Sequence, residues 1–135
     1  MEHHGGCLCG AVRYVAKGPL RDVVYCHCGQ CRKQTGLYYA ATAVDKADLT
    51  LTNDAALRWF AASDYAVRGF CGTCGSALFW KAHTAAHIAI LAGSLDDPSV
   101  LNAASHICTA GRPAFYALCD GLPQYEGASP GIEIA

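Results

Sequence analysis

The length, composition and charge of the chain are those of an ordinary single-domain protein. Its 135 residues suit one domain, and a content of 53% hydrophobic and 16% charged residues excludes a disordered chain. No apolar stretch reaches the roughly 18 residues of a membrane span, and residues 1–6 lack the basic start and apolar run of a signal peptide. A formal charge of −1 provides no basis for binding nucleic acid. We therefore expect one cytoplasmic domain over residues 1–135.

The predicted elements are mainly short strands separated by cysteine-rich turns. Alternating apolar residues and β-branched or aromatic runs predict strands at 11–15, 22–25, 37–44, 49–52, 57–60, 65–70, 76–80 and 87–92. Because Asn53 and Asp54 favour a turn, we expect the fourth and fifth of these strands to form a hairpin. Room for a helical turn or two exists only at 30–35 and 99–103, and the residues from Gly121 onward suggest irregular coil. The predicted fold class is therefore mainly β.

Nine cysteines exceed ordinary usage, and their spacing indicates metal binding. They occur as Cys7-x-Cys9, Cys26-x-Cys28-x-x-Cys31 and Cys71-x-x-Cys74, followed by isolated Cys108 and Cys119. Disulfides are disfavoured in a chain without an export signal. Closely spaced pairs suit a tetrahedral metal ion, because a tight turn can point two sulfurs at one ion about 2.3 Å away. We interpret seven of the nine cysteines as ligands of two zinc ions.

The first and third cysteine clusters predict a closed structural site. The segment 71–75 lies between two apolar strands, and its glycines permit the turn that exposes peptide N–H groups to sulfur. Four thiolates would fill a tetrahedral zinc site and contribute folding free energy directly. The alternative, a C-x-x-C redox pair, needs a helix that begins after the first cysteine, which Gly72 and Gly75 disfavour. The expected ligands of the structural zinc are Cys7, Cys9, Cys71 and Cys74.

The middle cluster, Cys26, Cys28 and Cys31, predicts a zinc site with an open position. Three protein ligands and one vacant position are typical of catalytic zinc. Three thiolates leave the ion with a formal charge of −1, so binding a substrate thiol as thiolate is favoured over activating water. Cys108 is the second choice for a fourth ligand. His27 alternates with its flanking cysteines, so we expect its side chain to point away from the metal.

Five motifs follow one another along the chain: Gly6-Cys7-x-Cys9-Gly10, Cys26-His27-Cys28-x-x-Cys31-Arg32-Lys33-x-Thr35-Gly36, Phe70-Cys71-x-x-Cys74-Gly75-Ser76, Gly93-x-Leu95-Asp96-Asp97-Pro98 and His106-Ile107. Their order and spacing resemble those of the glutathione-dependent formaldehyde-activating enzyme family, which also includes centromere protein V. The resemblance implies several small coiled antiparallel sheets, a β-tent, stapled by zinc knuckles. It also implies a structural zinc on the first and third clusters and a catalytic zinc on the middle one.

The resemblance further implies an activity and a partner. The founding activity of the family joins formaldehyde to the thiol of glutathione, which is carbon–sulfur lyase chemistry in reverse. This agrees with the thiol chemistry expected at the middle cluster. Arg32 and Lys33 are candidate contacts for a substrate carboxylate, and His106 is a candidate proton shuttle for the nascent alkoxide. The chain departs from its relatives at 112–115, where the expected aromatic residue is shifted or changed.

Two alternatives to an enzyme stay open from the sequence. One is a non-catalytic zinc module on the same fold that binds a small thiol or another protein. The other is a purely structural protein in which the middle zinc has four protein ligands. The coordination around Cys26, Cys28 and Cys31 distinguishes these readings.

Overall fold

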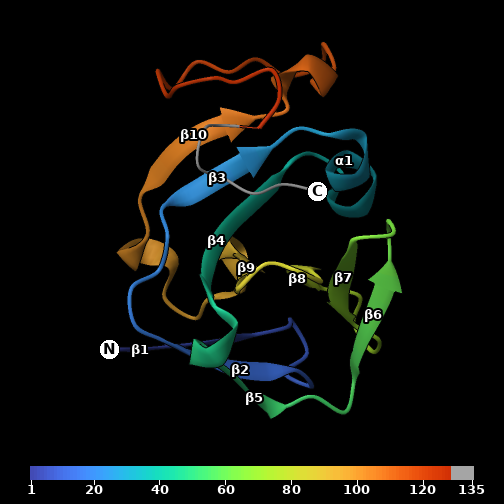
Figure 1. Ribbon diagram of the computed structural model, residues 1–135, viewed down its shortest axis with the longest axis vertical. Coiled ribbons are helices and arrows are strands. Elements are labelled where there is room, and N and C mark those ends of the chain that lie inside the picture. Colours follow the sequence, from blue (N-terminus) through green and yellow to red (C-terminus); the bar gives the residue numbers. More distant parts are fainter. Residues whose placement is uncertain (129–135) are drawn as a thin grey trace.

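The computed structural model describes residues 1–128 and confirms a mainly β architecture with one α-helix (Figure 1). A small sheet has the strand order β1-β2-β5, and a large sheet has the order β10-β3-β4-β9-β8-β7-β6. The strands are β1 Glu2–Gly6, β2 Arg13–Lys17, β3 Val23–Cys26, β4 Tyr39–Asp45, β5 Leu49–Asn53, β6 Leu57–Ala61, β7 Ala66–Cys71, β8 Ala77–Ala82, β9 His87–Leu91 and β10 Ala103–Ile107. The helix α1 spans Gly29–Thr35, and no helix among residues 1–128 is long and apolar enough to cross a membrane.

The large sheet curls strongly, from β10 and β3 at the top of Figure 1 to β7 and β6 at its right, with α1 between the two ends. Its paired strands are antiparallel except for β10, which runs parallel to β3. The register sets His106 beside Tyr25 and Ile107 beside Cys26. The curl therefore brings α1 and the end of β3 close to β7, although β7 is distant from both of them in the sequence.

The main core lies between the small sheet and the inner face of the large one. Leu78 and Phe79 of β8 are completely buried, as is nearly all of Tyr14 of β2. Tyr14 packs edge-on against Phe79 with ring centroids 5.4 Å apart, and its hydroxyl lies 2.6 Å from Ser94 Oγ. A Cβ at Gly5 would overlap that hydroxyl, which explains a glycine in β1.

The predicted hairpin of 49–52 with 57–60 is wrong. Both strands exist, but β5 pairs with β2 and β6 pairs with β7. Leu49 and Leu51 of β5 pack against the main core, whereas Leu57 of β6 lies opposite Cys71. Core packing and the register of β7 therefore separate two strands that the turn-forming residues Asn53 and Asp54 alone would join in a hairpin.

Two further differences concern strands that were not predicted. β1 consists of polar residues and glycines, and it forms because β2 supplies a full antiparallel partner. The segment 99–103 has room for a helical turn or two, but only a 3-10 turn forms over Pro98–Val100, capped by Asp97, and β10 follows it. The predicted helical turn at 30–35 is confirmed as part of α1.

The position of the core can be tested with two Leu→Ala substitutions. Leu78 is fully buried, whereas Leu8 is 90% exposed. We expect Leu78→Ala to lower the free energy of unfolding by about 2–5 kcal/mol, because it removes buried methyl groups and leaves a cavity. Leu8→Ala should change it by less than about 0.5 kcal/mol. Urea denaturation of the metal-loaded protein measures both, and equal effects would contradict this assignment of the core.

Candidate metal centres and active site

The first candidate metal centre brings together the four cysteines of the first and third clusters. The sulfur atoms of Cys7, Cys9, Cys71 and Cys74 all lie within 4.8 Å of one another. The Cys7–Cys9 sulfur distance is 3.6 Å and the Cys9–Cys71 distance is 3.8 Å. A tetrahedral ion with metal–sulfur bonds of about 2.3 Å requires sulfur–sulfur edges of about 3.8 Å. The four donors therefore fit one tetrahedral metal ion.

Hydrogen-bond donors surround these sulfurs at the turn between β7 and β8. The peptide N–H groups of Thr73 and Cys74 each donate to Cys71 Sγ at 3.4 Å. The hydroxyl of Ser76, 3.2 Å from Cys74 Sγ, and its peptide group hold the pKa of the Cys74 thiol well below the usual range, at about 5. The turn thus stabilises thiolates, which are the metal-binding form of cysteine.

The second candidate centre contains three cysteines at the junction of β3 and α1. The sulfurs of Cys26, Cys28 and Cys31 lie within 4.8 Å of one another. Cys28 is the N-cap of α1, and its Sγ accepts a hydrogen bond of 3.4 Å from the peptide N–H of Cys31. The neighbouring sulfurs of Cys28 and Cys31, together with burial, raise the pKa of Cys26. Because three crowded thiols cannot all ionise without a compensating cation, this donor set also fits a metal ion.

The three-cysteine centre opens onto a cavity of about 260 Å³. Trp80, Ala89 and Ile107 are among its apolar walls. Its polar lining consists of Arg21, Gln30, Tyr39, Tyr65, Arg68 and His87. Cys108 also lines the cavity, but its sulfur lies outside the group of three. The centre therefore has three close sulfur donors and an adjacent space large enough for a small substrate.

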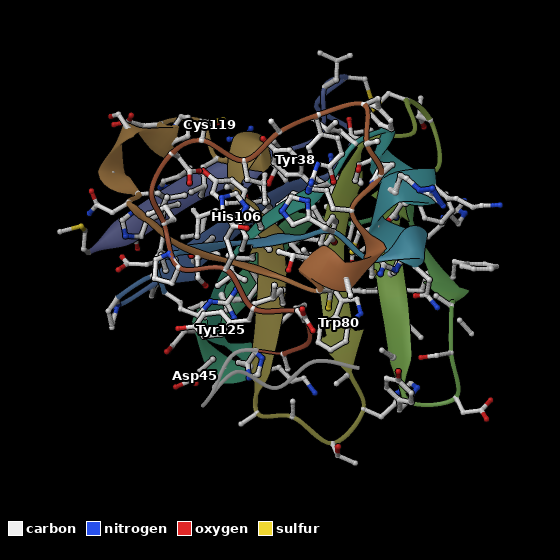
Figure 2. All side chains as sticks on the ribbon, turned by 90° about the horizontal axis from the view of Figure 1, so that it is seen from above. Tyr38, Asp45, Trp80, His106, Cys119 and Tyr125 are labelled. Carbon is white, nitrogen blue, oxygen red and sulfur yellow. The ribbon has the colours of Figure 1, made fainter. Side chains whose placement is uncertain are left out.

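Two buried histidines lie outside the cavity lining and are joined in one hydrogen-bonded chain. His27 Nδ1 is 2.6 Å from the Tyr116 hydroxyl, and its Nε2 is 2.9 Å from His106 Nδ1. His106 Nε2 lies 2.8 Å from Asp120 Oδ2. Burial, together with His106, lowers the pKa of His27 to about 4, so this ring is neutral near pH 7. Figure 2 shows His106 and Tyr38 beneath the C-terminal segment, with Trp80 of the cavity wall apart from them.

The three non-metal residues singled out from the sequence also lie outside the cavity lining. His106, which belongs to the hydrogen-bonded chain of histidines, is only 2% exposed. Arg32 and Lys33 belong to the last turn of α1, where Arg32 is half-buried and Lys33 is exposed. Their roles as proton shuttle and substrate contacts stay predictions.

Sequence reasoning missed Arg68, which contacts the second centre directly. Its Nη2 donates to Cys31 Sγ at 3.5 Å and to Gln30 Oε1 at 3.3 Å, and its Nη1 donates to Gln34 Oε1 at 2.9 Å. Burial opposes the charge and lowers the pKa of Arg68, but the hydrogen bond to Cys31 and the nearby Cys31, Tyr39 and Cys28 together raise it above its usual value. Arg68 shares the buried face of β7 with Ala66. A charged residue at an inward-facing strand position is the signal that could have found it.

Removal of one ligand from each centre should have unequal effects. Cys71→Ala opens the centre that joins the turns of two sheets, so we expect loss of soluble folded protein. Cys28→Ala should leave a folded protein that binds one metal ion instead of two. Elemental analysis and circular dichroism measure both, with the exposed Cys119→Ala as a control that retains two ions. Equal loss of folding in the Cys71 and Cys28 variants would contradict the distinction between the centres.

Comparisons with known proteins agree with this arrangement. The chain matches the family model described as glutathione-dependent formaldehyde-activating enzyme over residues 2–111, which include all seven clustered cysteines. A crystal structure of a Rhodobacter sphaeroides protein is similar to it with a TM-score of 0.60 and 21% sequence identity. That match covers 90% of this chain and 98% of the other, and it shows a shared fold. The chain therefore belongs to the glutathione-dependent formaldehyde-activating enzyme family.

Proposed function

We propose that this protein is a carbon–sulfur lyase-type enzyme that adds a small thiol such as glutathione to formaldehyde or a related aldehyde, and catalyses the reverse reaction. The observation that carries the proposal is a centre of three cysteines that faces a cavity. The family description names glutathione and formaldehyde, which supports the choice of substrates. We also propose a cytoplasmic location, where thiols and the nine cysteines of the chain stay reduced.

We propose zinc for both centres. Thiolate ligands and tetrahedral sulfur spacing favour zinc over harder cations. Cys7, Cys9, Cys71 and Cys74 would hold the structural ion, and Cys26, Cys28 and Cys31 the catalytic one. Bound at the three-cysteine centre, zinc would lower the pKa of a substrate thiol and orient the resulting thiolate.

The proposed reaction requires no oxidant or reductant. A bond forms between the thiol sulfur and the aldehyde carbon, the π electrons of the carbonyl move to its oxygen, and that oxygen receives the proton lost by the thiol. Trp80 and Ile107 provide apolar walls against which the non-reacting part of the substrates can pack. His106 is our candidate for moving the proton, because its ring bonds to the half-exposed Asp120. Arg32 and Lys33 are candidates for contacting the outer part of a larger thiol.

A structural role for the second centre is the competing function. Cys108 lines the same cavity as the three cysteines. Burial raises the pKa of its thiol above the usual value, although an interaction with Cys26 offsets part of this rise. If Cys108 were the fourth ligand, the centre would be closed and unable to hold a substrate thiol.

The proposed activity predicts that the protein accelerates the exchange between free glutathione and its formaldehyde adduct. The two compounds also combine spontaneously, so the rate must be compared with that of the same mixture without protein. Nuclear magnetic resonance exchange measurements on the metal-loaded protein should show an increased rate. Cys28→Ala should return the rate to background, whereas Cys119→Ala should leave it unchanged. A background rate with both centres loaded would contradict the proposal for this pair of substrates.

A further inference from the structure

Two residues that line the cavity each carry a buried polar atom without a hydrogen-bond partner. These groups are Nε of Arg68 and the hydroxyl of Tyr39. The two residues are only 5% and 4% exposed, and both line the cavity beside the three cysteines. A buried donor without an acceptor is costly and rare in native proteins. Two of them on residues that line one cavity point to a ligand group that supplies the missing acceptor.

The free N–H of Arg68 is held in a fixed position. Both hydrogens of its Nη2 are taken by Gln30 and Cys31 and one hydrogen of Nη1 by Gln34, whereas the buried Nε has no acceptor at all. The guanidinium also lies over the ring of Tyr39, 5.2 Å from its centroid. These contacts tie α1, β4 and β7 together at the cavity. The donors are therefore arranged before any ligand arrives, which is the condition for strong electrostatic stabilisation.

The charges around the cavity favour a negatively charged acceptor. Arg21 and Arg68 both line the cavity, and its lining contains no Asp or Glu, so their two positive charges exceed the formal charge of −1 that three thiolates and a zinc ion would carry. Within residues 1–128, neither guanidinium forms a salt bridge with a carboxylate. Arg21 instead donates from Nη2 to the carbonyl of Ala41 at 3.1 Å. Cationic donors in a largely apolar cavity bind an anionic oxygen more strongly than a neutral one.

We propose that Arg68 Nε and the Tyr39 hydroxyl form a subsite for a negatively charged oxygen of the substrate, beside the three-cysteine centre. Two substrate groups have this chemistry. One is a carboxylate on the thiol, and the other is the aldehyde oxygen, which gains negative charge as the carbon–sulfur bond forms. This inference rests on the proposed function because it assigns a group of the same substrates to named donors.

Binding measurements test, without requiring turnover, whether the subsite holds a carboxylate on the thiol. Isothermal titration calorimetry on the metal-loaded protein compares 3-mercaptopropionate with its neutral amide, 3-mercaptopropionamide. If the subsite holds the carboxylate, the acid should bind about tenfold more tightly, as expected for a charge-assisted hydrogen bond. Tyr39→Phe and Arg68→Lys should each remove most of this preference and leave the affinity for the amide nearly unchanged.

Kinetic measurements on the same variants test whether the subsite holds the aldehyde oxygen. If the subsite holds the aldehyde oxygen, Tyr39→Phe should leave thiol affinities unchanged but slow the glutathione–formaldehyde exchange by about tenfold or more. Unchanged affinities and an unchanged exchange rate in both variants would overturn the proposal. A wild-type protein without exchange activity that still prefers the acid would overturn the proposed reaction alone, and the subsite would stand.

Stability measurements separate a binding role from a structural one. The Tyr39 hydroxyl has no partner in the structure, so Tyr39→Phe should retain both metal ions and match or exceed the stability of the wild-type protein. Tyr14→Phe is the matched control, because the Tyr14 hydroxyl is also buried but bonds to Ser94 outside the cavity. It should lower stability without changing the preference for the acid. A loss of metal or stability in Tyr39→Phe equal to that of Tyr14→Phe would overturn the proposal.

Discussion

Four sulfurs packed within 4.8 Å of one another constrain the whole molecule. Cys7 and Cys9 follow β1, whereas Cys71 ends β7 and Cys74 follows it, so the four sulfurs come from both sheets. Cys9 and Cys71, whose sulfurs are 3.8 Å apart, are 62 positions apart in the chain. Four thiolates at this spacing repel one another unless a cation lies between them. A metal ion bound there would join the two sheets, so we expect its binding to be coupled to formation of the core around Tyr14 and Phe79.

The second centre differs because its three sulfurs belong to one short segment at the end of β3. It joins no second sheet, so we expect the fold to tolerate an open ligand position there. Its surroundings come from distant parts of the chain: β10 lies beside β3, and Arg68 reaches it from β7. The curl of the large sheet makes this possible and leaves a cavity against the cysteines. Our proposal thus assigns stability to one centre and chemistry to the other, although both are made of the same residue type.

The sequence predicted what is encoded locally. Cysteine spacings of two and three positions define each cluster, and apolar alternation located eight strands. What was missed depends on distant partners. β1 and β10 form because β2 and β3 pair with them, and the hairpin of 49–52 with 57–60 fails because each strand has a better partner elsewhere. Arg68 escaped notice because its contact with Cys31 spans 37 positions and depends on the curl of the sheet.

The unequal coordination of the two centres is the central claim, and a crystal structure of the metal-loaded protein measured at the zinc absorption edge tests it most directly. We predict two zinc peaks per chain. One should have four cysteine sulfurs at about 2.3 Å, and the other should have only Cys26, Cys28 and Cys31, with a non-protein ligand facing the cavity. A second zinc with Cys108 Sγ at bonding distance would contradict the claim.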